Sequence, residues 1–143
     1  MPDPTVTLLG NGDDMSFKDD LAAAKAARSE TVMVDVAIGA SLYQIEVRRL
    51  DGMQWADIMA DAPPNNEVAG RLGFDVYKAA LIACRKYSRL LDADGNEVPD
   101  VDWGDLFAAI SGAEVSGIGA TWWALNMADP NRRVDALKKA LAA

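Results

Sequence analysis

A pair of alternating segments around Gly39-Ala40 constrains the fold more than any other feature. In TVMVDVAI (31–38) the apolar residues recur at every second position, which predicts a strand with one apolar face. Gly39-Ala40 can make a two-residue turn, because glycine readily adopts the positive φ that such a turn needs. Folding back about this turn predicts the pairs Val36–Tyr43, Val34–Ile45 and Val32–Val47 on one face, and Asp35–Gln44, Met33–Glu46 and Thr31–Arg48 on the other. A slip of one residue would separate the apolar pairs, so the register is well specified.

Helical patterns account for most of the remaining chain. Ser16, Asp51 and Asp75 resemble helix N-caps, and Asp129-Pro130 resembles a cap with proline in the first turn. The helix after Asp75 is expected to reach about Leu91 and to be the central core helix, with an apolar face made of Tyr77, Ala80, Leu81, Cys84, Tyr87 and Leu91. Further helices are predicted to begin at Trp103 and at about Ala113, and loops are predicted at 63–72 and 92–102.

These elements define a fold class and a domain. A two-stranded hairpin is marginally stable in water, so helices or a partner must cover its apolar face. The predicted class is mainly α with a small β-hairpin (α+β), an antiparallel hairpin followed by a compact helical bundle. Residues 1–14 are predicted to be a flexible N-terminal tail, and 15–143 a single domain with the hairpin at about 31–49 and helices at about 52–142. Both Met1 and Met15 stay open as the native start.

Composition excludes several classes of function. The net charge of −8 disfavours binding to nucleic acid or to anionic membranes. With no histidine and a single cysteine, the chain lacks the commonest general base, the commonest metal ligand and any internal disulfide. We therefore predict that it is not an enzyme and has no catalytic, cofactor-binding or metal-binding residues. No signal peptide and no membrane span is evident, so the expected compartment is the cytoplasm.

One loop resembles a calcium-binding loop. Asp92, Asp94 and Asn96 stand at its first, third and fifth positions, but Glu97 occupies the place of the glycine at the sharp turn. Trp103 occupies the place of the bidentate glutamate, so a solvated turn is the better interpretation.

Other polar and reactive side chains have ordinary structural explanations. Cys84 is expected to be a buried core thiol, since it lies on an apolar helix face. Asp35 and Glu46 are expected to lie near each other on a solvated sheet face. Lys78, Arg85, Lys86 and Arg89 form a basic stripe on the central helix. We interpret it as a solvated face rather than as a docking site for an acidic partner segment.

Two adjacent tryptophans are the strongest candidates for contacts with a partner. Neighbouring residues on a helix point about 100° apart, so Trp122 and Trp123 can both be buried only if their helix is covered over a wide arc. Either both complete the core, or one faces a partner, since tryptophan is frequent at interface hot spots. The predicted partner-binding residues are Trp122, Trp123, Trp55 and Met59.

The order of features resembles a known family. The valine-rich hairpin leads into YQIEVRRLDGMQWADIMADAPP, and a mid-chain helix then precedes VDWGDLFAAISGAEVSGIGATWWALN. This arrangement, over about residues 30–127, resembles the tail assembly chaperones of long-tailed bacteriophages, especially those of actinobacterial hosts. The matching positions are Val47 to Leu50, Pro63-Pro64, and Trp103 to Asn126, whereas Gly117 and Gly119 interrupt the late helix and depart from the pattern.

The resemblance implies a role in assembly. Such proteins bind and solubilise the helical tape measure protein in the cytoplasm of the infected host, and are absent from the finished virion. The resemblance also implies that a frameshifted longer form recruits tail tube subunits. Self-association of the chain is a further interaction that stays open. Two alternatives remain: a structural tail or connector subunit retained in the virion, and a small enzyme with a carboxylate-bound metal.

Overall fold

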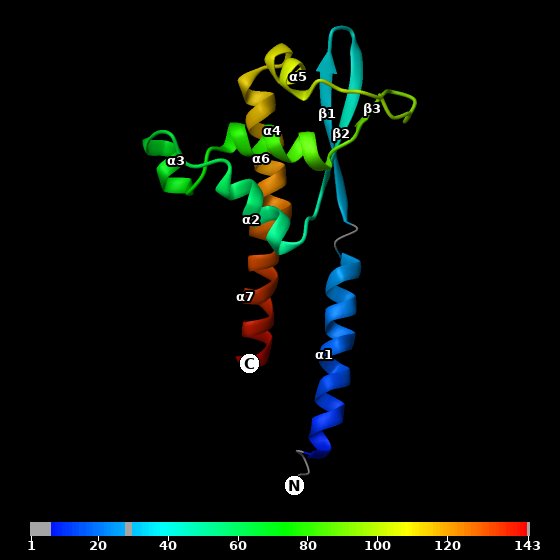
Figure 1. The fold of residues 1–143 in the computed structure, drawn as a ribbon, viewed down its shortest axis with the longest axis vertical. Helices are drawn as coiled ribbons and strands as arrows, with labels where there is room; N and C mark the ends of the chain where they lie inside the picture. The colour runs from blue at the N-terminus through cyan, green and yellow to red at the C-terminus, as the bar shows by residue number, and fades with distance from the viewer. Residues whose placement is uncertain (1–6, 28–29, 143) are drawn as a thin grey trace. The chain divides into compact units, whose positions relative to one another are not determined.

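The computed structural model describes residues 7–27 and 30–142, and the chain divides into two units, Met1–Glu30 and Thr31–Ala143 (Figure 1). The N-terminal unit contains one helix, α1 (Thr7–Ala27). The predicted helix start at Ser16 is wrong, because α1 begins nine residues earlier, within the predicted flexible tail, and runs through the predicted cap. Local sequence is a weak guide here, since Gly10 and Gly12 lower helix propensity without preventing a helix. Residues 1–6 of the predicted tail lie outside the described residues.

The hairpin has the predicted register. Strands β1 (Thr31–Ile38) and β2 (Ser41–Arg48) are antiparallel, and all six predicted pairs are present. Gly39 has a φ of +63° at the turn, whereas Ala40 keeps an ordinary negative φ. This combination is the one that a type II′ turn requires, so the reason for a glycine at the turn is confirmed.

A short third strand extends the sheet. Strand β3 (Leu90–Leu91) pairs with β2, giving the order β1-β2-β3. The predicted helix therefore does not reach Leu91, and the central helix α4 (Val76–Tyr87) ends before β3 begins. The helix ends early for a tertiary reason. Leu90 and Leu91 could continue a helix, but they form a strand here because the neighbouring strand β2 offers backbone groups with which they pair.

Side-chain caps set the boundaries of the shorter helices. Asp51 begins α2 (Gly52–Ala60) with the predicted capping box, and Asp75 caps α4 through the backbone N–H groups of Tyr77 and Lys78. The predicted loop at 63–72 is wrong in its second half, where α3 (Glu67–Leu72) forms. Asn66 provides its cap, since Oδ1 accepts the Ala69 N–H at 2.8 Å.

The C-terminal third begins with two capped helices. Asp102 caps α5 (Trp103–Ala109), and Ser111 caps α6 (Gly112–Trp123) in a capping box with Glu114. From α6 the chain stays helical through a π-helical segment η1 (Ala124–Ala128) into α7 (Asp129–Ala142), as Figure 1 shows.

Helix α7 begins at Asp129, as predicted, but the predicted N-cap at Asp129-Pro130 is wrong, because no break separates α7 from the helix before it. Asp129 has helical φ and ψ (−66° and −45°), and its N–H reaches back five residues to the Ala124 carbonyl. Proline has no N–H to continue the α-helical pattern, and a π turn just before it is one way for a helix to pass such a residue.

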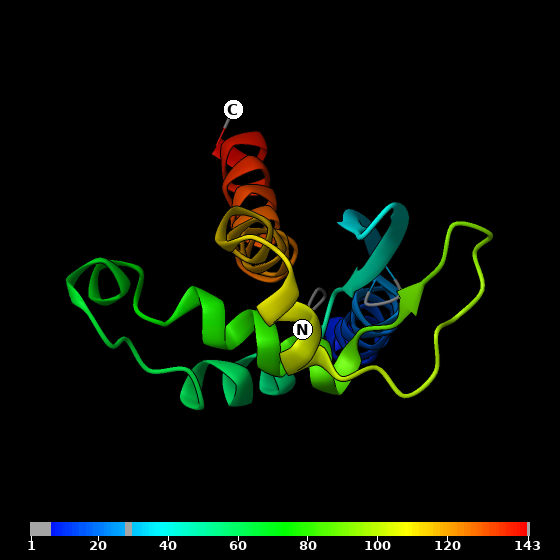
Figure 2. The ribbon, with the colours of Figure 1, turned by 90° about the horizontal axis from the view of Figure 1, so that it is seen from above.

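The hydrophobic core contains residues of the sheet and of α2, α4, α5 and α6, where α4 and α6 contact the sheet and α2 and α5 contact α4; these elements can be followed in Figures 1 and 2. Its most deeply buried large side chains come from different elements and are Val36, Ile45, Val47, Ile58, Phe74, Cys84, Ile118 and Trp122. The mainly helical α+β class is thus confirmed, with the three-stranded sheet on one side of the helices. This packing positions one end of the α4–α6 contact as a candidate site.

Candidate partner-binding site

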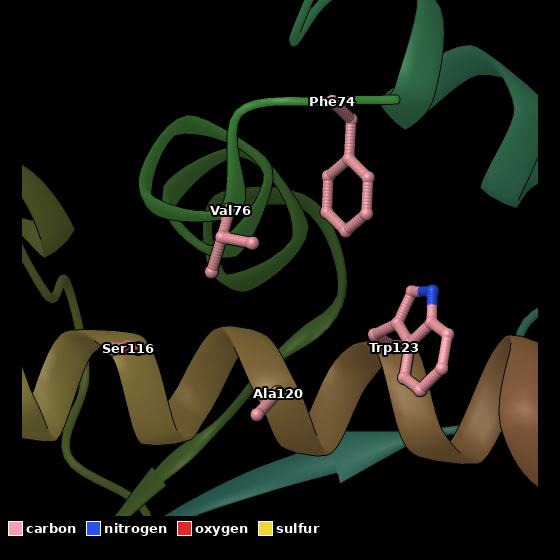
Figure 3. Close-up of a pocket in the computed structure, with 5 residues that line it drawn as sticks. All are labelled: Phe74, Val76, Ser116, Ala120 and Trp123. Carbon is pink, nitrogen blue, oxygen red and sulfur yellow. The ribbon is translucent and has the colours of Figure 1, made fainter. Parts of the chain in front are cut away.

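An apolar pocket opens where the beginning of α4 crosses α6. It has a volume of about 230 Å³ and is lined by Phe74, Val76, Ser116, Ala120 and Trp123. Figure 3 shows the ring of Phe74 above the indole of Trp123 at one end of the pocket, with Val76 and Ala120 to the left of the two rings and Ser116 farther along α6. Because almost all of the lining is apolar, the pocket suits a hydrophobic side chain better than a polar ligand.

The two adjacent tryptophans differ in how far they are exposed to solvent. Trp122 is 1% exposed and lies in the core, whereas Trp123 is 40% exposed and lines the pocket. This division follows from the 100° step between neighbouring helical residues, because the body of the protein covers α6 on one side only. Of the two alternatives for the pair, the structure shows one indole in the core and one at the surface.

Gly119 determines how closely α4 and α6 approach each other. A Cβ atom at this position would lie 2.6 Å from Val76 Cγ1 and 3.0 Å from the Val76 carbonyl oxygen. Gly117, two residues earlier, has open space around it. Gly119 is therefore the residue that allows Val76, which lines the pocket, to lie against α6.

The close approach also changes which face of α4 is buried. The predicted core face included Tyr77, but this side chain is 54% exposed. The buried positions carry small side chains, namely Ala79, Ala80, Ala83 and Cys84; Ala80 and Cys84 were predicted on this face, whereas Ala79 and Ala83 were not. A helix that contacts a glycine face must itself present small residues, which explains the shift.

Trp55 and Met59 are less accessible than a partner-binding role requires. Trp55 is buried and packs edge to face on Phe74, with ring centroids 6.4 Å apart. Met59 is half-buried against the core. Of the four predicted partner-binding residues, Trp123 has the most exposed side chain, whereas Trp55 contacts the pocket residue Phe74 from within the core.

A second hollow lies on the other side of the α4–α6 contact. It is more open, with a volume of about 500 Å³, and combines exposed Tyr77 with Leu81, Phe107 and Val115. Asp75 and Lys78 also line it, so it has a polar rim that the Trp123 pocket lacks. Both hollows border the contact between α4 and α6.

Cys84 is a core thiol, as predicted. Burial raises its pKa to about 11, although the Ser88 hydroxyl and the Trp122 indole N–H act in the opposite direction. The thiol therefore stays protonated at neutral pH, and a protonated thiol is a poor nucleophile.

The polar face of the hairpin differs from the prediction at Glu46. Asp35 is exposed and bonded to Gln44, but Glu46 is only 8% exposed and accepts two hydrogen bonds from Arg89, at 3.1 and 2.8 Å. The hydrogen bonds from Arg89 hold the pKa of Glu46 below its usual value. Glu46 is buried because β3 brings Arg89 beside β2, so this face is not a uniformly solvated surface.

Arg89 is therefore not part of the predicted basic stripe on the central helix. It follows the end of α4 and pairs with Glu46 and, at 3.6 Å, with Glu97. Lys78, Arg85 and Lys86 are exposed, in agreement with a solvated face.

The calcium-like segment forms a tight turn between β3 and Glu97. Asp92 Oδ1 accepts the backbone N–H groups of Asp94 and Asn96, at 3.0 and 2.9 Å, and Gly95 has a positive φ of 84°. The Asp92 carboxylate thus bonds to its own loop. Within 7–27 and 30–142, no group of three or more acidic or cysteine side chains is placed to hold a metal ion.

Asn126 is a structural residue that the sequence analysis missed. Its Oδ1 accepts the Leu50 N–H at 2.8 Å, and its Nδ2 donates to the carbonyls of Trp122 and Arg48. These bonds hold the end of α6 against the segment that follows β2. An asparagine one turn after a buried tryptophan was the only local signal, and it cannot identify a partner 76 residues away.

Comparison with protein-family models, with curated proteins and with solved structures finds no match to this chain. In the part of the chain that the structure describes, no helix is long and apolar enough to cross a membrane. Any functional conclusion therefore depends on the pocket and surfaces described above.

Proposed function

We propose that this chain is a non-enzymatic tail assembly chaperone of a long-tailed bacteriophage, which binds and solubilises the helical tape measure protein. The observation that best supports this role is the apolar pocket beside the half-exposed Trp123. An exposed indole at the edge of a preformed hollow is a typical anchor for an apolar side chain of a helical partner. In this proposal the protein acts in the host cytoplasm, helps recruit tail tube subunits and is absent from the virion.

The dimensions and chemistry of the pocket favour weak, repeated binding. Phe74, Val76 and Ala120 offer apolar contact, whereas Ser116 is the one polar lining residue. A single side chain in such a pocket gives limited affinity, but several copies along one long client add up by multivalency. Weak individual contacts also allow release when tail tube subunits arrive.

Co-expression with a tape measure fragment tests this proposal. We expect the wild-type protein to keep the fragment in the soluble fraction, and Trp123→Ala to reduce the soluble amount several-fold. Met53→Ala is the matched control, because Met53 is another exposed apolar side chain that does not line the pocket. Circular dichroism would verify that both variants fold.

Two outcomes would contradict the proposal. If the fragment precipitates equally with and without the protein, the chaperone role fails. If the protein is found in purified virions at stoichiometric amounts, it is a structural tail or connector subunit instead.

A further inference from the structure

Helix α7 exposes an apolar stripe that nothing in its own unit covers. Val134, Leu137 and Leu141 are 49%, 58% and 87% exposed, and none of the 14 residues of α7 is buried. Their spacing of three and four residues places them on one side of the helix. A regular apolar stripe on an otherwise polar helix favours a contact with another helix.

Basic side chains border this stripe on both sides. At 3.6 residues per turn, Arg133 lies about 70° from the centre of the stripe in one direction and Lys138 about 70° in the other. Arg132 and Lys139 lie on the opposite side of the helix, and Arg132 bonds to Asp129 there. The stripe is therefore bordered by positive charge, within a chain of net charge −8.

We propose that α7 is a docking helix for an acidic amphipathic helix of a partner protein. The partner would pack its apolar side chains on Val134, Leu137 and Leu141, and place carboxylates beside Arg133 and Lys138. Charges that border an apolar helical seam determine which partner is accepted, because like charges there repel and opposite charges attract. This surface is separate from the Trp123 pocket and does not depend on the function proposed for it.

Charge argues against two other occupants of the stripe. A second copy of α7 would bring Arg133 and Lys138 close to the same basic side chains, which is repulsive. A membrane surface is a poorer fit, because α7 contains no aromatic residue and the acidic remainder of the chain is repelled by anionic lipids.

A pair of designed peptides tests the proposal on the full-length protein. The first is a fluorescein-labelled peptide of about three heptads with Leu at positions a and d and Glu at e and g, and the second has Lys in place of Glu. By fluorescence anisotropy, we expect the Glu peptide to bind at least tenfold more tightly than the Lys peptide. Added salt should weaken this binding.

Two charge-reversal variants give the matched comparison. Arg133→Glu/Lys138→Glu should lose at least tenfold in affinity for the Glu peptide and gain affinity for the Lys peptide. Arg132→Glu/Lys139→Glu, which makes the same change in net charge on the opposite side, should stay within about twofold of wild type. Since α7 buries no residue, both variants should keep the folded body, as circular dichroism can verify.

Several results would overturn the proposal. These are equal binding of the two peptides, no binding of either, or equal loss of affinity in both variants. Dimerisation in sedimentation experiments that Leu137→Glu abolishes would assign the stripe to a second copy. Binding to phosphatidylserine vesicles that Arg133→Glu/Lys138→Glu abolishes would assign it to a membrane.

Discussion

The two ends of the last helical run differ in what they bury. In α6, Val115, Ile118, Gly119 and Trp122 are buried, and they face α4 and the sheet. In α7, which continues the same run, no residue is buried. Both segments nevertheless show apolar residues at helical spacing.

This contrast shows what an apolar stripe on a helix can and cannot predict. It predicts that another surface packs against the helix, but not whether that surface belongs to the same chain or to a partner. Hydrophobic burial stabilises a fold in proportion to the apolar area removed from water, so α6 contributes to stability and α7 contributes little within its own unit. If α6 holds the body together and α7 serves a partner, substitutions in the two segments should have very different effects on unfolding.

The largest effect is expected at Trp122. Trp122→Ala removes the largest fully buried side chain and leaves a cavity beside Cys84. We expect a loss of about 3–5 kcal/mol in the free energy of unfolding, measured by urea denaturation. A loss below about 1 kcal/mol would mean that α6 is not part of a tightly packed core.

A smaller effect is expected where α6 touches α4 most closely. Gly119→Ala places a methyl group against Val76, and we expect it to cost about 1–3 kcal/mol because the two helices must separate. Gly117→Ala is the matched control, since its Cβ meets nothing within 4 Å and alanine favours a helix by about 1 kcal/mol over glycine. Equal effects of the two substitutions in denaturation experiments would disprove the close approach at Gly119.

The smallest effect is expected on α7. Leu137→Ala removes an exposed side chain, so the free energy of unfolding should change by no more than about 0.5 kcal/mol. Thermal unfolding of the isolated protein, monitored by circular dichroism, can measure this. A clearly larger loss would show that Leu137 is covered within the protein and that the contrast between α6 and α7 is mistaken.

Much of the fold was predictable from local sequence. The hairpin register followed from alternation and the turn glycine, and the Asp51 and Asp75 caps followed from residue type and spacing. Where local signals competed, the prediction failed, as at Leu90–Leu91, at α3 and at Pro130. The candidate site was predictable in part, because the sequence pointed to Trp122 and Trp123 but left open which of them is exposed.

The sequence by itself determined the strand register, several helix starts and the presence of apolar stripes, because these depend on residues close together in the chain. Only the tertiary structure decided that Trp123 borders a pocket, that Gly119 sets the distance between α4 and α6, and that Glu46 is buried against Arg89. The physical reason is that burial and close approach depend on segments far apart in the sequence. Local periodicity predicts which face of a helix is apolar, and packing decides whether that face is covered or left for a partner.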